Sequence, residues 1–194
     1  MYKKFGREDR VIKNHARILF KIGQESKAEG FVNELLNKNL NDREAKKLEL
    51  AFKKTKLNSK EYVEALNAYL EENWDDADAW LELADTYEKK LNFDKAIYCY
   101  EEMLLLDPKE FCLYQKLAEL HFTMGKLDNL KVAKKYLCLL LNINNMALRS
   151  LWALYHTCKA LLKLEKGNHD NEKIIAIVEK KLGECYKRNS CVDF

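Results

Sequence analysis

The chain has 194 residues, of which 47% are hydrophobic, and it contains only 6 Gly and 1 Pro. So few turn-forming residues, together with abundant Leu, Lys, Glu and Ala, predict an almost entirely helical protein with a continuous core. The six cysteines have no paired spacing, and the longest apolar run, near Tyr136–Leu141, is too short to cross a bilayer. These features exclude a disulfide scaffold and a transmembrane protein.

The net charge of +3 conceals an uneven distribution along the chain. Residues 1–60 carry 16 basic and 8 acidic side chains, residues 61–130 carry 6 and 17, and residues 131–194 carry 12 and 6. An acidic middle section between basic flanks can present a surface to a basic partner. It can also reflect nothing more than solvated helix faces of different composition.

The N-terminal part predicts two helix pairs after a polar start at residues 1–8. The first pair opens near Asp9 and places Ala16 in the small-residue position of its first helix. The second pair opens near Arg43 and matches less well, because Tyr62 stands where a small residue is typical. Apolar residues nevertheless continue at helical intervals through this region.

The third pair opens near Ala77 and carries the clearest pattern of the chain. The tetratricopeptide (TPR) repeat has a period of about 34 residues and the pattern W-x2-L-G-x2-Y, then A-x3-F, then P. The segment resembles this repeat at Trp80, Leu83, Ala84, Tyr87, Ala96, Tyr100, Met103 and Pro108. Because one such repeat cannot bury its apolar face alone, the neighbouring segments are expected to be repeats as well.

The C-terminal part predicts two further pairs. A fourth pair opens near Phe111, and after a longer turn Asp128 or Asn129 is expected to cap its second helix. A fifth pair opens near residue 148, and its last helix is expected to run from Asn171 to about Lys187. The predicted fold is an all-α, TPR-type α-solenoid, a right-handed superhelix of about five helix pairs over residues 9–188, with a tail at 189–194.

No residue spacing typical of a catalytic, cofactor or metal site occurs in the chain. The aspartates Asp75, Asp76 and Asp78 lack the glycine of a calcium-binding loop and are expected to cap a helix. The tryptophans Trp74, Trp80 and Trp152 are expected mostly to pack between repeats, and the alternative is that they anchor a partner. We therefore expect no enzyme activity, no cofactor and no metal.

The basic patch between Lys46 and Lys60 is explained by a solvated helix face, so no nucleic-acid partner is expected. In a TPR superhelix the first helices of the pairs line the concave face. This arrangement predicts a partner groove at Glu82, Asp85, Gln115 and Glu119. Its acidic groups would repel the acidic C-termini that one TPR subclass binds, and would favour a basic partner.

Part of the chain resembles one particular TPR family, the subunit 2 family of the endoplasmic reticulum (ER) membrane protein complex. The resemblance covers roughly residues 60–160, and the extended turn before Leu130 is shared with that family. The segments that carry it are Leu66–Glu72, Trp80–Tyr87, Phe93–Met103, Tyr114–Glu119, Leu127–Leu130, Asn144–Arg149 and Leu151–Tyr155.

The resemblance implies a non-catalytic scaffold on the cytoplasmic face of the ER membrane. Its complex inserts tail-anchored and multi-pass proteins, and the subunit holds cytosolic parts of membrane-embedded subunits and of a further cytosolic subunit. It implies no membrane span and no small-molecule substrate. Family members usually carry an additional N-terminal helical region, so a reduced protein or an incomplete start is expected. The alternative is a TPR adaptor or co-chaperone in another assembly.

Overall fold

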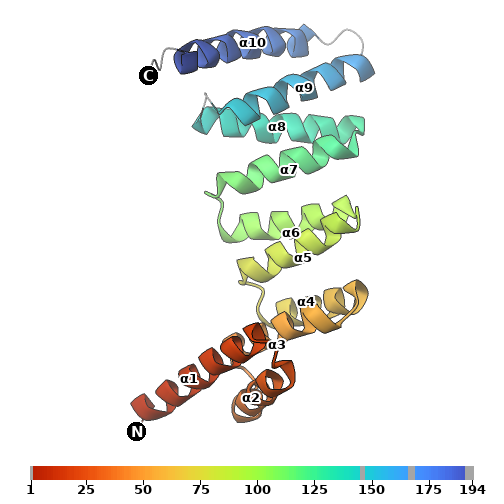
Figure 1. Cartoon of the computed structure of the whole chain (residues 1–194). Helices are drawn as coiled ribbons and strands as arrows, with labels where there is room; N and C mark the ends of the chain where they lie inside the picture. The colour runs from red at the N-terminus through yellow and green to blue at the C-terminus, as the bar shows by residue number, and fades with distance from the viewer. Residues whose placement is uncertain (1, 145–146, 166–168, 191–194) are drawn as a thin grey trace. The chain divides into compact units, whose positions relative to one another are not determined.

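The computed structural model describes residues 2–144, 147–165 and 169–190, and these residues form ten α-helices and no strand (Figure 1). The predicted all-α class is confirmed. The helices fall into two compact units, residues 1–79 and residues 80–194, which are described in turn. The tail residues 191–194 lie outside the described part of the chain.

The first unit contains helices α1 (Tyr2–Lys21), α2 (Glu25–Lys38), α3 (Arg43–Lys56) and α4 (Ser59–Glu72). α1 begins at Tyr2, ahead of Asp9, where the sequence predicts the first helix pair to open. The apolar stripes of α1, α2 and α3 meet in one core, which consists of Ala16, Ala28, Val32, Leu48 and Phe52.

Local sequence explains where α3 and α4 begin. Asp42 precedes α3, and its side chain accepts a hydrogen bond from the Ala45 backbone N–H at 3.1 Å. Asn58 and Glu61 form a capping box at the start of α4, in which each side chain binds the backbone of the other residue. These caps satisfy N–H groups that have no partner inside the helix.

One buried carboxylate joins α3, α4 and the start of α5 (Ala77–Lys89). Asp76 is only 3% exposed, and it accepts a hydrogen bond from the Tyr69 hydroxyl at 2.7 Å. It also lies 2.8 Å from the Lys47 Nζ and accepts the Ala79 backbone N–H at 3.4 Å. Burial alone would raise the pKa of Asp76, but the Lys47 ammonium and the Tyr69 hydroxyl outweigh burial and hold this pKa below its usual value.

The two neighbouring aspartates have a different role from the one predicted. Asp75 pairs with Arg43 at 2.9 Å, and Asp78 pairs with Lys47 at 3.1 Å. Capping therefore explains Asp76, whereas its neighbours mainly bind basic side chains that α3 presents. The cluster is an inter-helix ion-pair network.

The second unit contains most of α5, which crosses the boundary between the units, and five further helices. The chain leaves α7 (Phe111–Met124) through Gly125, whose φ of 69° is the left-handed conformation that glycine adopts without strain. α8 then begins at Leu127 with Lys126 at the N-cap, so the prediction that Asp128 or Asn129 caps it is wrong. The five helices are α6 (Phe93–Leu106), α7 (Phe111–Met124), α8 (Leu127–Ile143), α9 (Leu148–Leu164) and α10 (His169–Ser190).

The TPR-pattern residues of α5 and α6 are largely interior. Ala84 and Ala96 are both fully buried, so large side chains can pack around them. Tyr100 is also buried, and its hydroxyl donates to Glu88 at 2.7 Å. Leu83, Tyr87 and Met103 are buried as well, Trp80 is half-buried beside Tyr98, and Pro108 is exposed.

The packing role predicted for the tryptophans is wrong for Trp74, which is 66% exposed in the turn before α5. Trp152 is 37% exposed, and its indole N–H donates to the Tyr186 hydroxyl of α10 at 3.0 Å.

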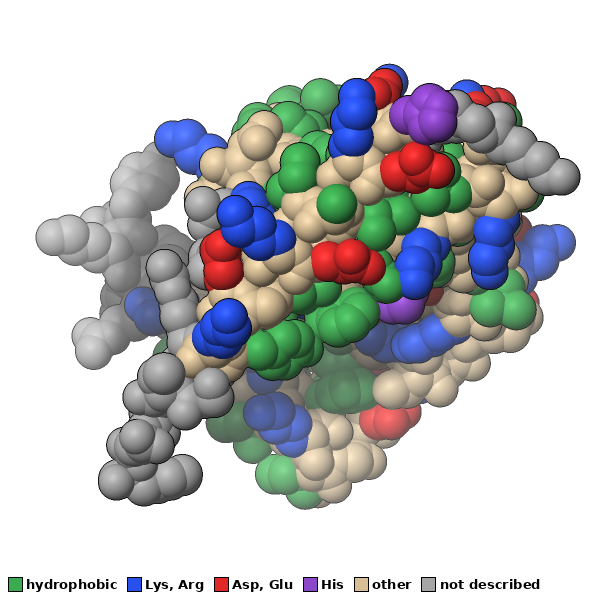
Figure 2. Space-filling view, turned by 90° about the horizontal axis from the view of Figure 1, so that it is seen from above, with side chains coloured by type: hydrophobic (Ala, Val, Ile, Leu, Met, Phe, Trp, Pro, Cys, Tyr) green, Lys and Arg blue, Asp and Glu red, His purple; other side chains and the backbone are tan. Residues whose placement is uncertain are grey.

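On the face viewed in Figure 2, hydrophobic, basic and acidic side chains are interspersed, so this face carries no single sign of charge.

We predict that Ala84→Trp destabilises the protein. Ala84 is fully buried, so a large side chain must displace its neighbours, at a cost of about 1–3 kcal/mol. The free energy of unfolding from urea denaturation measures the effect. The exposed neighbour provides the control, because Asp85→Ala is expected to change stability by about 0.5 kcal/mol or less. Equal stability of Ala84→Trp and the wild type would contradict this packing.

We predict that Asp76→Asn removes part of the acid sensitivity of stability. The pKa of Asp76 is lower in the folded than in the unfolded chain, so its stabilisation is present above the unfolded pKa of about 3.9 and is lost as the pH falls through the folded pKa. The variant should be less stable by about 1–3 kcal/mol at neutral pH, with a smaller difference below about pH 4.

Urea denaturation at a series of pH values measures this difference. Asp78→Asn is the matched control, because that carboxylate is 89% exposed and should contribute little at any pH. A wild-type-to-Asp76→Asn difference that does not change between neutral and acidic pH would contradict the ionic account.

Candidate functional site

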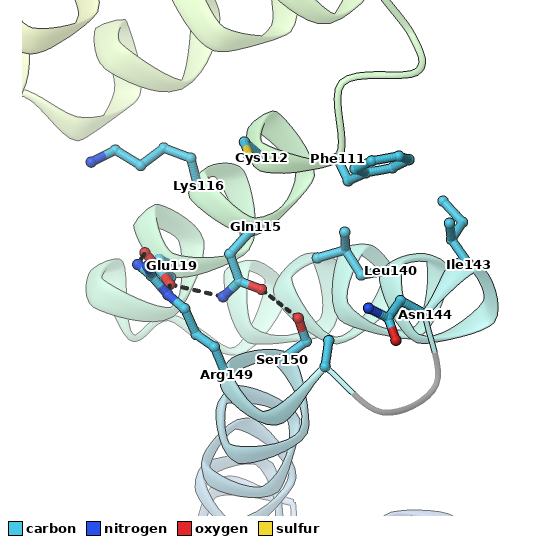
Figure 3. A pocket seen from close by; sticks show the side chains of 11 residues that line it. Phe111, Cys112, Gln115, Lys116, Glu119, Leu140, Ile143, Asn144, Arg149 and Ser150 are labelled. Atoms are coloured by element: carbon cyan, nitrogen blue, oxygen red, sulfur yellow. Dashed lines mark hydrogen bonds and ion pairs between the residues drawn. The ribbon is translucent and has the colours of Figure 1, made fainter.

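A hollow in the second unit lies between α7, the end of α8 and the start of α9 (Figure 3). Its volume is about 570 Å³, which is within the range typical of binding clefts. We call it the α7–α9 groove. Its lining residues are Phe111, Cys112, Gln115, Lys116, Glu119, Leu140, Ile143, Asn144, Ala147, Arg149 and Ser150.

A polar network closes one end of the α7–α9 groove. The Arg149 guanidinium binds both oxygens of Glu119, through Nε at 2.7 Å and Nη2 at 2.8 Å. Gln115 donates to Glu119 at 2.8 Å and accepts from the Ser150 hydroxyl at 2.7 Å. The network therefore ties the first turn of α9 to α7, which makes this end of the groove a preorganised surface.

Electrostatics keep this network ionised. Partial burial acts to raise the pKa of Glu119, but Arg149 and Gln115 outweigh it and hold the pKa below its usual value. A second ion pair joins Lys116 to Glu88 of α5 at 3.0 Å. The acidic members of both pairs thus already have cationic partners.

The opposite end of the groove is apolar. Figure 3 shows Phe111, Leu140 and Ile143 gathered there, away from Lys116 and Arg149. Phe111 is 53% and Ile143 is 61% exposed, whereas Leu140 is buried beneath them. Such a groove suits a ligand that has one apolar part and one charged part, such as a protein segment.

Two of the four residues that the sequence predicts as a partner groove line the α7–α9 groove. Gln115 and Glu119 line the α7–α9 groove, whereas Glu82 and Asp85 lie on α5 and are not among its lining residues. Glu119 is also matched by Arg149, so this groove is not the acidic surface that the sequence predicts.

The other side chains that line the groove were not predicted from the sequence. The repeat period could have indicated two of them, Arg149 and Ser150. Arg149 follows Glu119 by 30 residues, and Ser150 follows Gln115 by 35. Both separations are close to the TPR period of about 34 residues, which places equivalent positions of successive repeats side by side.

Cys112 is the one nucleophilic thiol that lines the groove. Its pKa is raised, chiefly because its thiol is hydrogen-bonded to the Glu110 carboxylate. A protonated thiol is a poor nucleophile. Within the described residues, no group of three or more His, Cys, Asp or Glu is placed to hold a metal ion, and none of the described helices is long and apolar enough to cross a membrane.

The succession of helices without strands in the described residues, together with the fully buried alanines of α5 and α6, defines a TPR-like α-solenoid. Solved structures support this fold class. A crystal structure of MamA superposes with a TM-score of 0.66 over 97% of each chain, at 15% identity. A chain of the Naa15/Naa10 complex bound to HypK-THB superposes with a TM-score of 0.63 over 90% of this chain and 25% of that one, at 18% identity.

Within this class, residues 13–129 match the family described as the EMC2 TPR-like repeat domain, and the chain belongs to that family. ER membrane protein complex subunit 2-A of Xenopus laevis is 37% identical over 131 residues, which are 64% of this chain and 44% of that protein. The TPR repeat protein oca3 of Schizosaccharomyces pombe is 27% identical over 185 residues, which are 94% of this chain and 65% of that protein. The chain therefore spans less than half of the Xenopus relative.

We predict a measurable coupling between Glu119 and Arg149. A bidentate pair on a partly exposed surface typically contributes about 0.5–1 kcal/mol, and salt screens it. A double-mutant cycle of Glu119→Gln and Arg149→Gln, measured by urea denaturation at low and high salt, gives the coupling. The exposed pair Lys173–Asp170, at 3.8 Å, is the control and should show almost none. Equal coupling in the two pairs would contradict a special role for the network.

Proposed function

We propose that the chain is a non-catalytic scaffold subunit of the ER membrane protein complex. The observation that carries the proposal is membership of the EMC2 TPR-like repeat family over residues 13–129. Relatives from Xenopus and Dictyostelium bear the name of subunit 2 of that complex. In this role the chain holds cytosolic parts of the membrane-embedded subunits and of a further cytosolic subunit, in a complex that inserts membrane proteins.

The chemistry of the α7–α9 groove supports a holding role over a catalytic one. Its carboxylate and guanidinium neutralise each other, and its thiol has a raised pKa. Apolar side chains exposed at its other end gain free energy when a partner covers them. Such features favour protein binding and offer no activated nucleophile.

The proposed location is the cytoplasmic face of the ER membrane, with attachment through other subunits. The name of the relatives supports the ER, and the TPR-like fold supports attachment through protein contacts. The proposal also includes a partner surface at Glu82 and Asp85 of α5. The carboxylates of α5 would steer a basic cytosolic segment toward this surface.

We predict that the tagged chain recovers integral membrane subunits after mild detergent extraction. Quantitative mass spectrometry of the purified complex is the measurement. Recovery of soluble chaperones without membrane subunits would contradict the proposal and support an adaptor or co-chaperone in another assembly.

In sealed microsomes added protease should digest the chain, because the cytoplasmic face is accessible, and protection would contradict the location.

The same purification tests the α5 surface. The double variant Glu82→Lys, Asp85→Lys should recover several-fold less of the membrane subunits, because like charges would then meet a basic segment. The matched control Glu179→Lys, Glu184→Lys makes the same charge change on exposed positions of α10 and should recover them normally.

A further inference from the structure

We infer that the α7–α9 groove binds an extended protein segment that carries bulky apolar side chains at one end and Asp or Glu at the other. The inference rests on the proposed scaffold role and names the chemistry of one segment that the scaffold would hold. It concerns a surface distinct from Glu82 and Asp85, which do not line this groove.

The apolar end of the groove defines one half of the segment. Phe111 at the start of α7 and Ile143 at the end of α8 both extend from this rim, with Leu140 between them as a floor (Figure 3). Both rim side chains are more than half exposed, although they lie beside a hollow of about 570 Å³. One or two Leu, Ile or Phe side chains would fill the hollow and cover this rim.

The charged end defines the other half, because its cations are more exposed than the anions that pair with them. Lys116 is 40% exposed against 22% for Glu88, and Arg149 is 75% exposed against 32% for Glu119. The charges balance, yet the ammonium and guanidinium groups are the ones that an incoming segment meets. Both groups only donate hydrogen bonds, so the complementary ligand group is an acceptor, and a carboxylate is the strongest one a protein offers.

The first turn of α9 adds to this preference. Its N-cap residue, Ala147, lines the groove and makes no side-chain cap hydrogen bond, and the turn contains no acidic residue. The positive end of the helix dipole thus faces the charged end of the groove and favours a negative group. A Lys-rich or Arg-rich segment would meet two exposed cations and this helix end, and would be repelled.

Selection from a randomised dodecapeptide display library on the purified full chain tests the inference. Enriched peptides should combine Leu, Ile or Phe in one half with Asp or Glu in the other half, in either order. The same selection on Ile143→Asp should lose them, because the substitution places a carboxylate on the apolar rim. Circular dichroism melts verify that the variant folds, as expected for a side chain 61% exposed at the end of α8.

Fluorescence anisotropy of the most enriched peptide then measures the charged end. Lys116→Glu should weaken binding by about tenfold or more, and added salt should weaken binding to the wild type. Lys180→Glu is the matched control, because it reverses the same charge at an exposed position of α10 and should leave the affinity unchanged.

The inference is overturned if the enriched peptides are basic or if Ile143→Asp enriches the same peptides. It is also overturned if the wild type enriches no peptide more strongly than Ile143→Asp does. These outcomes are separable from failure of the proposed function. Recovery of membrane subunits together with basic groove peptides would preserve the scaffold role and reject the groove chemistry. If the groove selects acidic, apolar peptides but the purified chain recovers no membrane subunits, the groove chemistry would stand and the scaffold role would be rejected.

Discussion

Close approach of neighbouring helices is the constraint on which the structure depends. Each amphipathic helix can bury its apolar side only against the next ones, and small side chains at the crossings determine how near they come. Ala16, Ala28 and Ala45 in the first unit and Ala84 and Ala96 in the second are all fully buried. Stability is therefore a sum of contacts between neighbours, distributed along the chain.

Polar side chains then connect equivalent positions of successive repeats. Lys13 binds Glu44, which lies 31 residues later, and Arg43 binds Asp75, which lies 32 residues later. Arg149 binds Glu119 across 30 residues in the second unit. Each bond crosses from one helix pair to the next, so the ion pairs fix the register of a stack whose apolar contacts are less directional. The α7–α9 groove lies beside one of these bonds, because Glu119 and Arg149 are both among its lining residues.

The fold could be predicted because the spacing of small and large apolar residues directly encodes helix packing. The pattern that begins at Trp80 identifies the repeat, and the same residues are mostly interior in the structure. The site could be predicted only in part. Gln115 and Glu119 follow from their positions on a first helix, but the balance of charge at Glu119 depends on Arg149, which belongs to the next repeat.

The remaining errors have similar local causes. Trp74 is exposed because the chain leaves α4 just before it, at Asn73, so the aromatic ring falls outside the helical register. The start of α8 lies at Leu127 because Gly125 reverses the chain directly after α7. Periodicity describes helix interiors well and specifies poorly where a turn ends.

The cysteines of the second unit can report how readily its helices separate locally. Cys99 of α6, Cys158 of α9 and Cys185 of α10 are buried, whereas Cys112 of α7 is exposed. Burial raises the pKa of the Cys99 thiol to about 12 and that of the Cys158 thiol to about 11, which suppresses the reactive thiolate in the closed state. Of these four thiols, a thiol reagent would therefore modify Cys112 first and reach the three buried ones only when their helices separate. The rate at each thiol would report the opening free energy of that part of the stack, so the order of modification would reveal whether the solenoid frays from an end or opens in the middle.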